Sequence, residues 1–214
     1  MLRRILEEYL CKNRKHNVSY YTQVGNITYE RSMIMKAVQP IRDREKIEEI
    51  KRILKHESYR NYFLFVMGIN TGLRISDLLP LQVKDVRNKT HIVIREKKTG
   101  NIKRFLINDA LRKEIDEYTQ GMNDDDYLFK SERGNKPIQR VQAYKIINSA
   151  AKKAGLEEIG THTLRKTFGY HFYQRTKDVA MLQEIFNHSA PSITLRYIGI
   201  TQDEIDNSLK EFNL

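Results

Sequence analysis

The sequence predicts a mainly α-helical domain with a small antiparallel β-sheet, an α+β fold. Apolar residues recur at helical spacing through most of the chain after residue 42, whereas two β-branched runs, His91–Arg95 and residues 102–107, flank a Gly-containing turn. Hydrophobic residues make up 40% of the 214 residues, and no tract is of low complexity. A packed core is therefore expected rather than disorder.

The first elements of this domain follow a boundary at Pro40. A charged stretch after it predicts an amphipathic helix whose apolar face holds Ile47, Ile50, Ile53 and Leu54. Residues 62–69 (YFLFVMGI) are apolar on all sides, which predicts a buried helix that ends at Thr71-Gly72. A short helix over residues 75–79 should then stop at Pro80.

The two β-branched runs enclose Lys97-Lys98-Thr99-Gly100-Asn101, so we expect a β-hairpin with a basic tip. Helical patterns resume after it, at residues 109–118, 139–154, 164–174 and 179–186. The chain then divides into three parts: a short N-terminal segment (residues 1–41), the main domain (42–200) and a C-terminal helical tail (201–214). The tail carries an apolar stripe of Ile205, Leu209 and Phe212, which either closes the domain's own core or docks on a neighbouring subunit.

Charge points to the class of partner. Lys and Arg number 38 against 27 Asp and Glu, a formal charge of +11, and such an excess favours a polyanion. Cys11 is the only cysteine, which excludes an intrachain disulfide and a thiolate zinc site. No apolar run approaches the roughly 20 residues that cross a bilayer, and Glu7 and Glu8 interrupt the N-terminal apolar stretch. We expect a cytoplasmic protein that does not enter a membrane.

Two arginines stand at predicted helix starts, where a guanidinium is suited to grip a phosphate. Arg74 follows Gly72, and Asp77 lies three residues later on the same helical face, either orienting Arg74 or forming a plain ion pair. His162 and Arg165 are also three apart, and Thr161 or Thr163 could cap their helix. Each pattern alone occurs often by chance.

Taken in order, these segments resemble the tyrosine recombinases, or phage integrases. TGLRISDL matches the family's first arginine motif at Arg74, with Asp77 as its acidic follower, and HTLRKTF matches the HxLR motif at His162 and Arg165. KKTG matches the family's hairpin lysine; Lys97 competes for that place, but the position before Thr-Gly favours Lys98. FNHSAPS and TLRYIG match the late histidine and the nucleophile, at His188 and Tyr197.

The resemblance implies a catalytic domain over residues 42–200 that cleaves and rejoins DNA strands through a 3′-phosphotyrosine. Tyr197 would attack, with His162 as its base, while Arg74 and Arg165 hold the phosphate. Lys98 would protonate the departing 5′-oxygen, and His188 would donate a hydrogen bond to a nonbridging oxygen. Asp77 would position these groups.

The implied partner is double-stranded DNA, bound by a homotetramer that forms from monomers through the tail, and no cofactor or metal ion is implied. Two rival functions stay open: nicking and religation of the topoisomerase IB kind, and a DNA-binding regulator descended from a recombinase. About 40 residues precede the domain here, where the family usually has a larger core-binding domain. The chain is then a minimal member or a fragment, or it has a reduced core-binding region. Asn187 stands where the family has glycine, and asparagine tolerates the left-handed conformation that a glycine there suggests.

Overall fold

The computed structural model describes residues 21–24, 27–30, 38–97, 100–157, 159–200 and 209–210. The chain forms two compact units, residues 1–37 and 38–214. In the first unit, strands β1 (Tyr21–Val24) and β2 (Ile27–Glu30) pair in antiparallel register. The sequence analysis did not predict this hairpin. The N-terminal apolar stretch that Glu7 and Glu8 interrupt lies outside the described residues.

In the second unit, helices α2 (Arg44–Glu57) and α3 (Tyr59–Thr71) form the first part of the core. The side chain of Asp43 accepts a hydrogen bond from the Glu45 backbone N–H and caps α2. The predicted apolar face is confirmed: Ile47, Ile50 and Leu54 are buried. Most of α3 is buried, which agrees with its uniformly apolar sequence.

The chain then turns through α4 (Ile75–Leu78) and the short 3₁₀ helix η1 (Val83–Asp85) into the predicted hairpin. Strands β3 (His91–Arg95) and β4 (Ile102–Leu106) pair antiparallel, with Ile92 opposite Phe105. These two side chains are buried, while Val93 and Leu106 are exposed, as alternation along a strand requires. The hairpin therefore covers the core with one face only.

Five further helices complete the domain: α5 (Asp109–Thr119), α6 (Arg140–Lys153), α7 (Thr161–Thr176), α8 (Val179–Phe186) and α9 (Pro191–Ile198). The prediction of an α+β fold is confirmed, and α8 has the bounds predicted from the sequence, residues 179–186. Helix α7 extends beyond the predicted residues 164–174 at both ends. Its cap is Gly160, so the expectation of a threonine cap was wrong; Thr163 instead accepts a hydrogen bond from the Gly160 backbone N–H.

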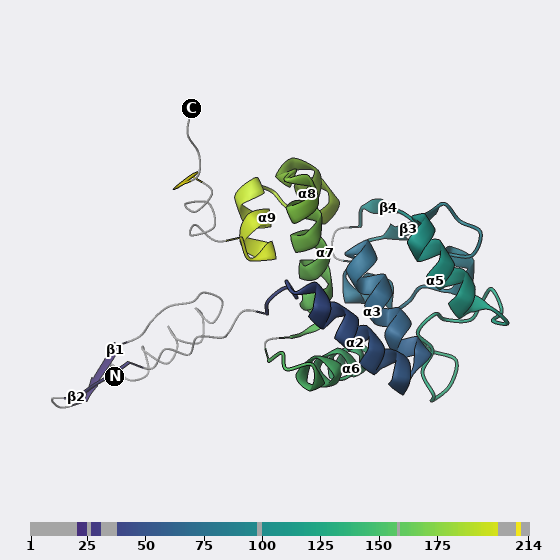
Figure 1. The fold of residues 1–214 in the computed structure, drawn as a ribbon, viewed down its shortest axis with the longest axis horizontal. Coiled ribbons are helices and arrows are strands. Elements are labelled where there is room, and N and C mark those ends of the chain that lie inside the picture. The colour runs from purple at the N-terminus through teal and green to yellow at the C-terminus, as the bar shows by residue number, and fades with distance from the viewer. Residues whose placement is uncertain are drawn as a thin grey trace, which may run out of the picture. The chain divides into compact units, whose positions relative to one another are not determined.

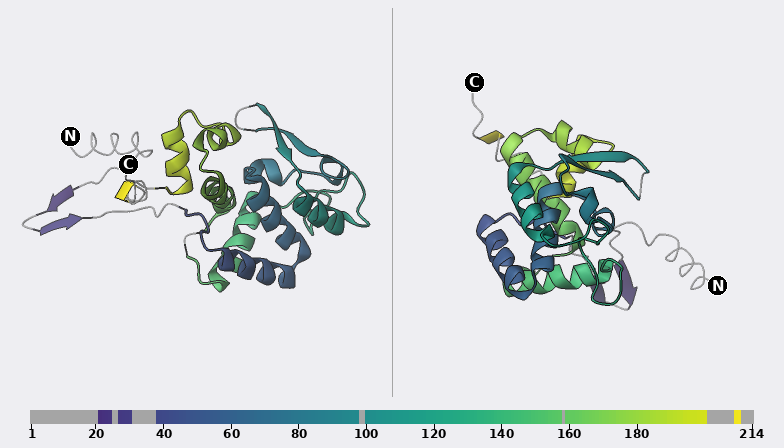
Figure 2. Two further views of the ribbon diagram at one scale, coloured as in Figure 1. Left: turned by 45° about the horizontal axis from the view of Figure 1, so that its top comes forward. Right: turned by 90° about the vertical axis from the view of Figure 1, so that its right-hand side faces the viewer.

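Helix α7 connects the parts of the domain, because it contacts α3, α6, α8 and α9. Figure 1 shows α8 and α9 together at one end, with the β3–β4 hairpin and α5 at another, and Figure 2 gives the same arrangement from two further directions. Helices α3 and α6 contact α7, and α2 packs against both α3 and α6. Among the described helices, none is both long and apolar enough to span a bilayer.

The chain enters and leaves this domain at neighbouring points. The Arg42 guanidinium donates to the backbone oxygen of Gly199, just after α9, over 2.6 Å. Both backbone polar groups of Ile41 contact α7. Its N–H donates to Thr167 Oγ1, and its carbonyl oxygen lies 2.9 Å from His171 Nε2. Helix α7 thus anchors the segment that leads into α2.

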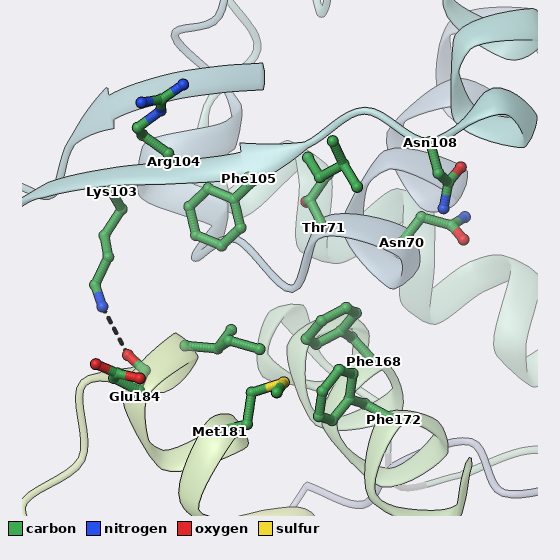
Figure 3. Close-up of a pocket in the computed structure, with 12 residues that line it drawn as sticks. Asn70, Thr71, Lys103, Arg104, Phe105, Asn108, Phe168, Phe172, Met181 and Glu184 are labelled. Atoms are coloured by element: carbon green, nitrogen blue, oxygen red, sulfur yellow. Dashed lines mark hydrogen bonds between the residues drawn. The ribbon is translucent and has the colours of Figure 1, made fainter. Parts of the chain in front are cut away.

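A largely apolar cavity of about 490 Å³ lies between β4, α7 and α8. Figure 3 shows Phe105 on one side facing Phe168, Phe172 and Met181 on the other. At its edge the Lys103 ammonium donates to the backbone oxygen of Glu184 over 2.6 Å, which ties the hairpin to α8. Arginines 74 and 165 do not line this cavity.

Candidate active site

Arg74 takes its place from the way α3 ends. Gly72 closes α3 in the left-handed conformation, with φ of 63°, which favours glycine. A Cβ there would lie 2.4 Å from the Phe168 ring of α7, so the position also needs the absence of a side chain. Two residues later Arg74 caps α4 in an extended conformation. The glycine and the short helix therefore place the guanidinium at the start of α4, as the sequence predicted.

Two buried carboxylates hold Arg74. Its guanidinium forms a hydrogen-bonded ion pair with Glu96, at the end of β3, and lies 3.9 Å from Asp77 Oδ2. Asp77 also accepts a hydrogen bond from the Lys97 backbone N–H over 3.1 Å, which connects α4 to the hairpin tip. Both acids are buried, so their charges act on Arg74 with little screening by water. The sequence analysis did not name Glu96.

Arg165 is 3% exposed and lies in the second turn of α7. One guanidinium nitrogen donates to the backbone oxygen of Gly72 over 2.6 Å, and the other donates to that of Phe186 over 3.0 Å. The guanidinium carbon lies 4.2 Å from the centre of the Phe186 ring. Burial lowers the pKa of Arg165 to about 10, so the side chain stays charged at neutral pH. Arg165 thus joins the ends of α3 and α8 as well as facing the site.

A cavity of about 160 Å³ brings the two predicted arginines together. Arg74 and Arg165 line it with His162, and Arg140, at the start of α6, adds a third guanidinium. Arg140 was not predicted from the sequence as a residue of the site. The three guanidinium groups outnumber the two carboxylates that hold Arg74, so the cavity keeps a net positive charge that suits an anion.

Tyr197 lies on α9 beside this cavity, and its ring is held by aromatic contacts. Its Oη lies 3.5 Å from Nδ1 of His162. The ring centre lies 5.5 Å from that of Phe186 and 5.1 Å from that of His188, both in edge arrangements. His188 Nδ1 in turn lies 3.0 Å from Thr194 Oγ1, one turn before the tyrosine. The structure therefore gathers His162, Arg165, His188 and Tyr197 from three segments of the chain.

Asn187 explains how His188 reaches this place. It ends α8 in the left-handed conformation, with φ of 55°, as expected for the asparagine that replaces a glycine. The chain then turns into α9, which begins at Pro191.

The pKa values of Tyr197 and His162 shift in opposite directions. Burial raises the pKa of the Tyr197 phenol, and the charges of Arg165 and Arg74 oppose that rise. Although part of the His162 ring reaches solvent, loss of hydration lowers its pKa below 6.5, and the nearby cations, beginning with Arg140 and Lys166, lower it further. His162 is therefore neutral at pH 7 and able to accept a proton.

Lys98 lies outside the described residues, so the choice between it and Lys97 stays a prediction. Lys97 is exposed at the hairpin turn. Among the residues that the structure describes, no three His, Cys, Asp or Glu side chains gather as a metal ion would require.

Comparison with known proteins gives the family. The phage integrase family model matches residues 43–204. The chain belongs to the phage integrase family. It is 60% identical over 178 residues to "Probable integrase/recombinase YoeC" of Bacillus subtilis (strain 168), a match that covers 83% of this chain and 98% of YoeC. Membership makes this integrase a tyrosine recombinase, an enzyme that transfers DNA strands.

Solved structures agree with the fold of this integrase. The crystal structure of XerA recombinase matches with a TM-score of 0.67 at 21% identity, covering 84% of this chain and 66% of that one. The XerH site-specific recombinase bound to its difH substrate, in a pre-cleavage complex, matches with a TM-score of 0.62 at 20% identity, covering 90% and 60%. The integrase therefore spans about two thirds or less of each of these two chains.

Proposed function

We propose that Tyr197 is the nucleophile of site-specific recombination, cleaving and rejoining duplex DNA through a 3′-phosphotyrosine. The observation that carries this proposal is the place of the Tyr197 hydroxyl, which lies 3.5 Å from the His162 imidazole. That imidazole also lines the cavity of Arg74, Arg140 and Arg165. A nucleophile, a base and an anion site thus adjoin one another.

The arginines act on the scissile phosphate. In-line attack increases the negative charge on its nonbridging oxygens, and fixed guanidinium groups stabilise that charge. Arg165 needs no rearrangement for this, because Gly72 and Phe186 already hold it. Asp77 and Glu96 hold Arg74 in the same way.

The proton and the leaving group follow separate paths. The Tyr197 oxygen forms a bond to phosphorus as its proton passes to His162, and the bond from phosphorus to the 5′-oxygen breaks. Lys98 gives that oxygen a proton, so the products are a phosphotyrosine and a free 5′-hydroxyl. His188 donates a hydrogen bond to a nonbridging oxygen. Reversal of these steps rejoins the strand, and no cofactor takes part.

The DNA-bound XerH relative supports duplex DNA as the partner. The net charge of +11 has the sign that a DNA partner requires. We assign catalysis to residues 42–200 and place the reaction in the cytoplasm. We propose that the segment with the β1–β2 hairpin is separate from the unit that begins at residue 38.

The test is a nicked suicide substrate that carries the target site, on which the cleaved strand cannot be rejoined. A covalent adduct should accumulate, and mass spectrometry of its peptides should place the phosphate on Tyr197. A different attachment residue, or a 5′-phosphate in the adduct, would contradict the proposal. Strand exchange between two sites should follow on intact DNA, whereas relaxation of supercoiled plasmid without exchange would favour the topoisomerase-like alternative.

The role of His162 predicts the acidic limit of cleavage. Because the pKa of His162 is lowered below 6.5, the base stays neutral through pH 7, and cleavage should decline only below pH 6.5. In His162→Gln the rate should fall by about 10²–10⁴-fold and lose this acidic limb. Single-turnover rates across the range from about pH 5 to about pH 8 measure both. His56→Gln, an exposed histidine on α2, is the control, and an unchanged limb in His162→Gln would exclude His162 as the base.

We further propose that the integrase assembles as a homotetramer on DNA, with residues 201–214 of one copy docked on the next. The apolar cavity between β4, α7 and α8, with a volume of about 490 Å³, offers a surface on which the tail can dock. Of the tail stripe of Ile205, Leu209 and Phe212, the described Leu209 is 62% exposed within one copy. An apolar side chain left in water favours a partner surface of matching character.

Met181→Glu tests that assembly. Met181 is 51% exposed on the wall of the apolar cavity, and a carboxylate there would be desolvated by a docked tail. Tetramers on DNA should disappear, as seen by analytical ultracentrifugation, while single-site cleavage persists. Deletion of residues 201–214 should give the same result, and Lys113→Glu on α5 should assemble normally. Normal tetramers in Met181→Glu would exclude this surface.

A further inference from the structure

Lys166 lies against the proposed nucleophile and has no part in the reaction as assigned so far. Its Nζ is 5.2 Å from the centre of the Tyr197 ring. It lies four residues after His162, so these two side chains share one face of α7. Lys166 is half-buried, and burial lowers its pKa, which means that protein has replaced part of the water around its ammonium.

We propose that Lys166 is an electrostatic partner of the nucleophile, stabilising the phenolate character that Tyr197 gains as it attacks. The proposal rests on the role of Tyr197 assigned above. A cation near the ring attracts the neutral phenol weakly, through the quadrupole of the ring. It attracts a phenolate more strongly, because the charge of a phenolate spreads from oxygen into the ring. The interaction therefore strengthens during the reaction, which is the condition for catalysis.

The other charged and titratable groups around Tyr197 do not replace this contact. His162 adjoins the hydroxyl and takes the proton. Arg165 and Arg74 also act on the Tyr197 phenol, but both line the anion cavity. The His188 ring meets the tyrosine ring edge-on. When a phosphate enters, its negative charge will partly neutralise the two guanidinium groups. A cation that does not line the cavity keeps its full effect on the tyrosine at that moment.

The competing role for Lys166 is a contact to the DNA backbone, as for many surface lysines. The two roles differ in what they change. A backbone contact contributes to affinity and to its salt dependence, whereas a partner of the nucleophile changes the rate of the bound complex. The two roles can therefore be separated at saturating DNA.

The test compares Lys166→Met and Lys166→Arg with Lys113→Met. The control removes an equal charge from an exposed position on α5. Single-turnover cleavage is measured on the suicide substrate at saturating DNA. Lys166→Met should cleave about 10- to 100-fold more slowly, which corresponds to a rise of one to two units in the effective pKa of the tyrosine. Lys166→Arg should stay within about threefold of the wild type, since the charge is kept. Lys113→Met should match the wild type.

A more acidic nucleophile makes the test specific. With 3-fluorotyrosine at position 197, Lys166→Met should recover most of its lost rate, and its pH–rate profile should shift back toward that of the wild type. A loss of packing or of DNA contact would not respond in this way. Full-rate cleavage by Lys166→Met, or a loss confined to DNA affinity with a smaller salt dependence, overturns the proposal for Lys166. Absence of a wild-type adduct at Tyr197 would instead overturn the proposed function beneath it.

Discussion

Tyr197→Phe is expected to abolish the covalent protein–DNA adduct, a loss of more than about 10⁴-fold in cleavage. The change removes only Oη, which is the atom that must bond to phosphorus. The ring contacts with Phe186 and His188 stay, so the fold and the affinity for DNA should be preserved. Gel analysis of the suicide substrate measures the adduct, and a binding assay on the same DNA checks affinity.

The control for this substitution is Tyr173→Phe, on α7, which should form the adduct at the wild-type rate. The chain contains 12 tyrosines, so the result is informative only if the other phenols do not compensate. An adduct of normal yield in Tyr197→Phe would remove the nucleophile assignment altogether.

Arg165→Lys should slow cleavage by about 10²–10³-fold although the positive charge is kept. A guanidinium reaches the backbone oxygens of Gly72 and Phe186 with two separate nitrogens, whereas an ammonium is a single point. One oxygen would lose its donor, and the remaining charge would shift relative to the phosphate. The same lost hydrogen bond should lower the free energy of unfolding by about 1–3 kcal/mol.

Single-turnover cleavage and chemical denaturation measure the two effects of Arg165→Lys separately. Arg175→Lys, an exposed arginine in the last turn of α7, should change neither. If Arg165→Lys lowers stability but cleaves at the wild-type rate, the arginine connects α3 and α8 without acting on the phosphate.

Local signals in the sequence predicted most of the helices and the β3–β4 hairpin. The bounds of α8 followed from an apolar period that starts after Asp178, whose side chain accepts a hydrogen bond from the Met181 N–H, and that ends at Asn187. The start of α7 was missed, because its first turn (Thr161, His162 and Thr163) carries little apolar signal. The β1–β2 hairpin was not predicted, although β-branched residues flank Gly25-Asn26, a typical turn pair.

The residues of the candidate site were predicted from sequence motifs and not from helix or strand patterns. Family motifs predicted Arg74, His162, Arg165, His188 and Tyr197, and the structure brings them together. Glu96 and Lys166 were not predicted, because their contacts, with Arg74 and with Tyr197, join residues 22 and 31 positions apart in the sequence. A glutamate after a strand and a lysine on a helix resemble solvated residues until the tertiary contacts are known. Lys98 and most of the tail stripe stay predictions, since they lie outside the described residues.

The hydrogen bond from Arg42 to Gly199 has a consequence for how this domain can be transplanted. Because the chain arrives and departs at almost the same point, the domain can be spliced into a loop of a foreign protein without stretching either junction.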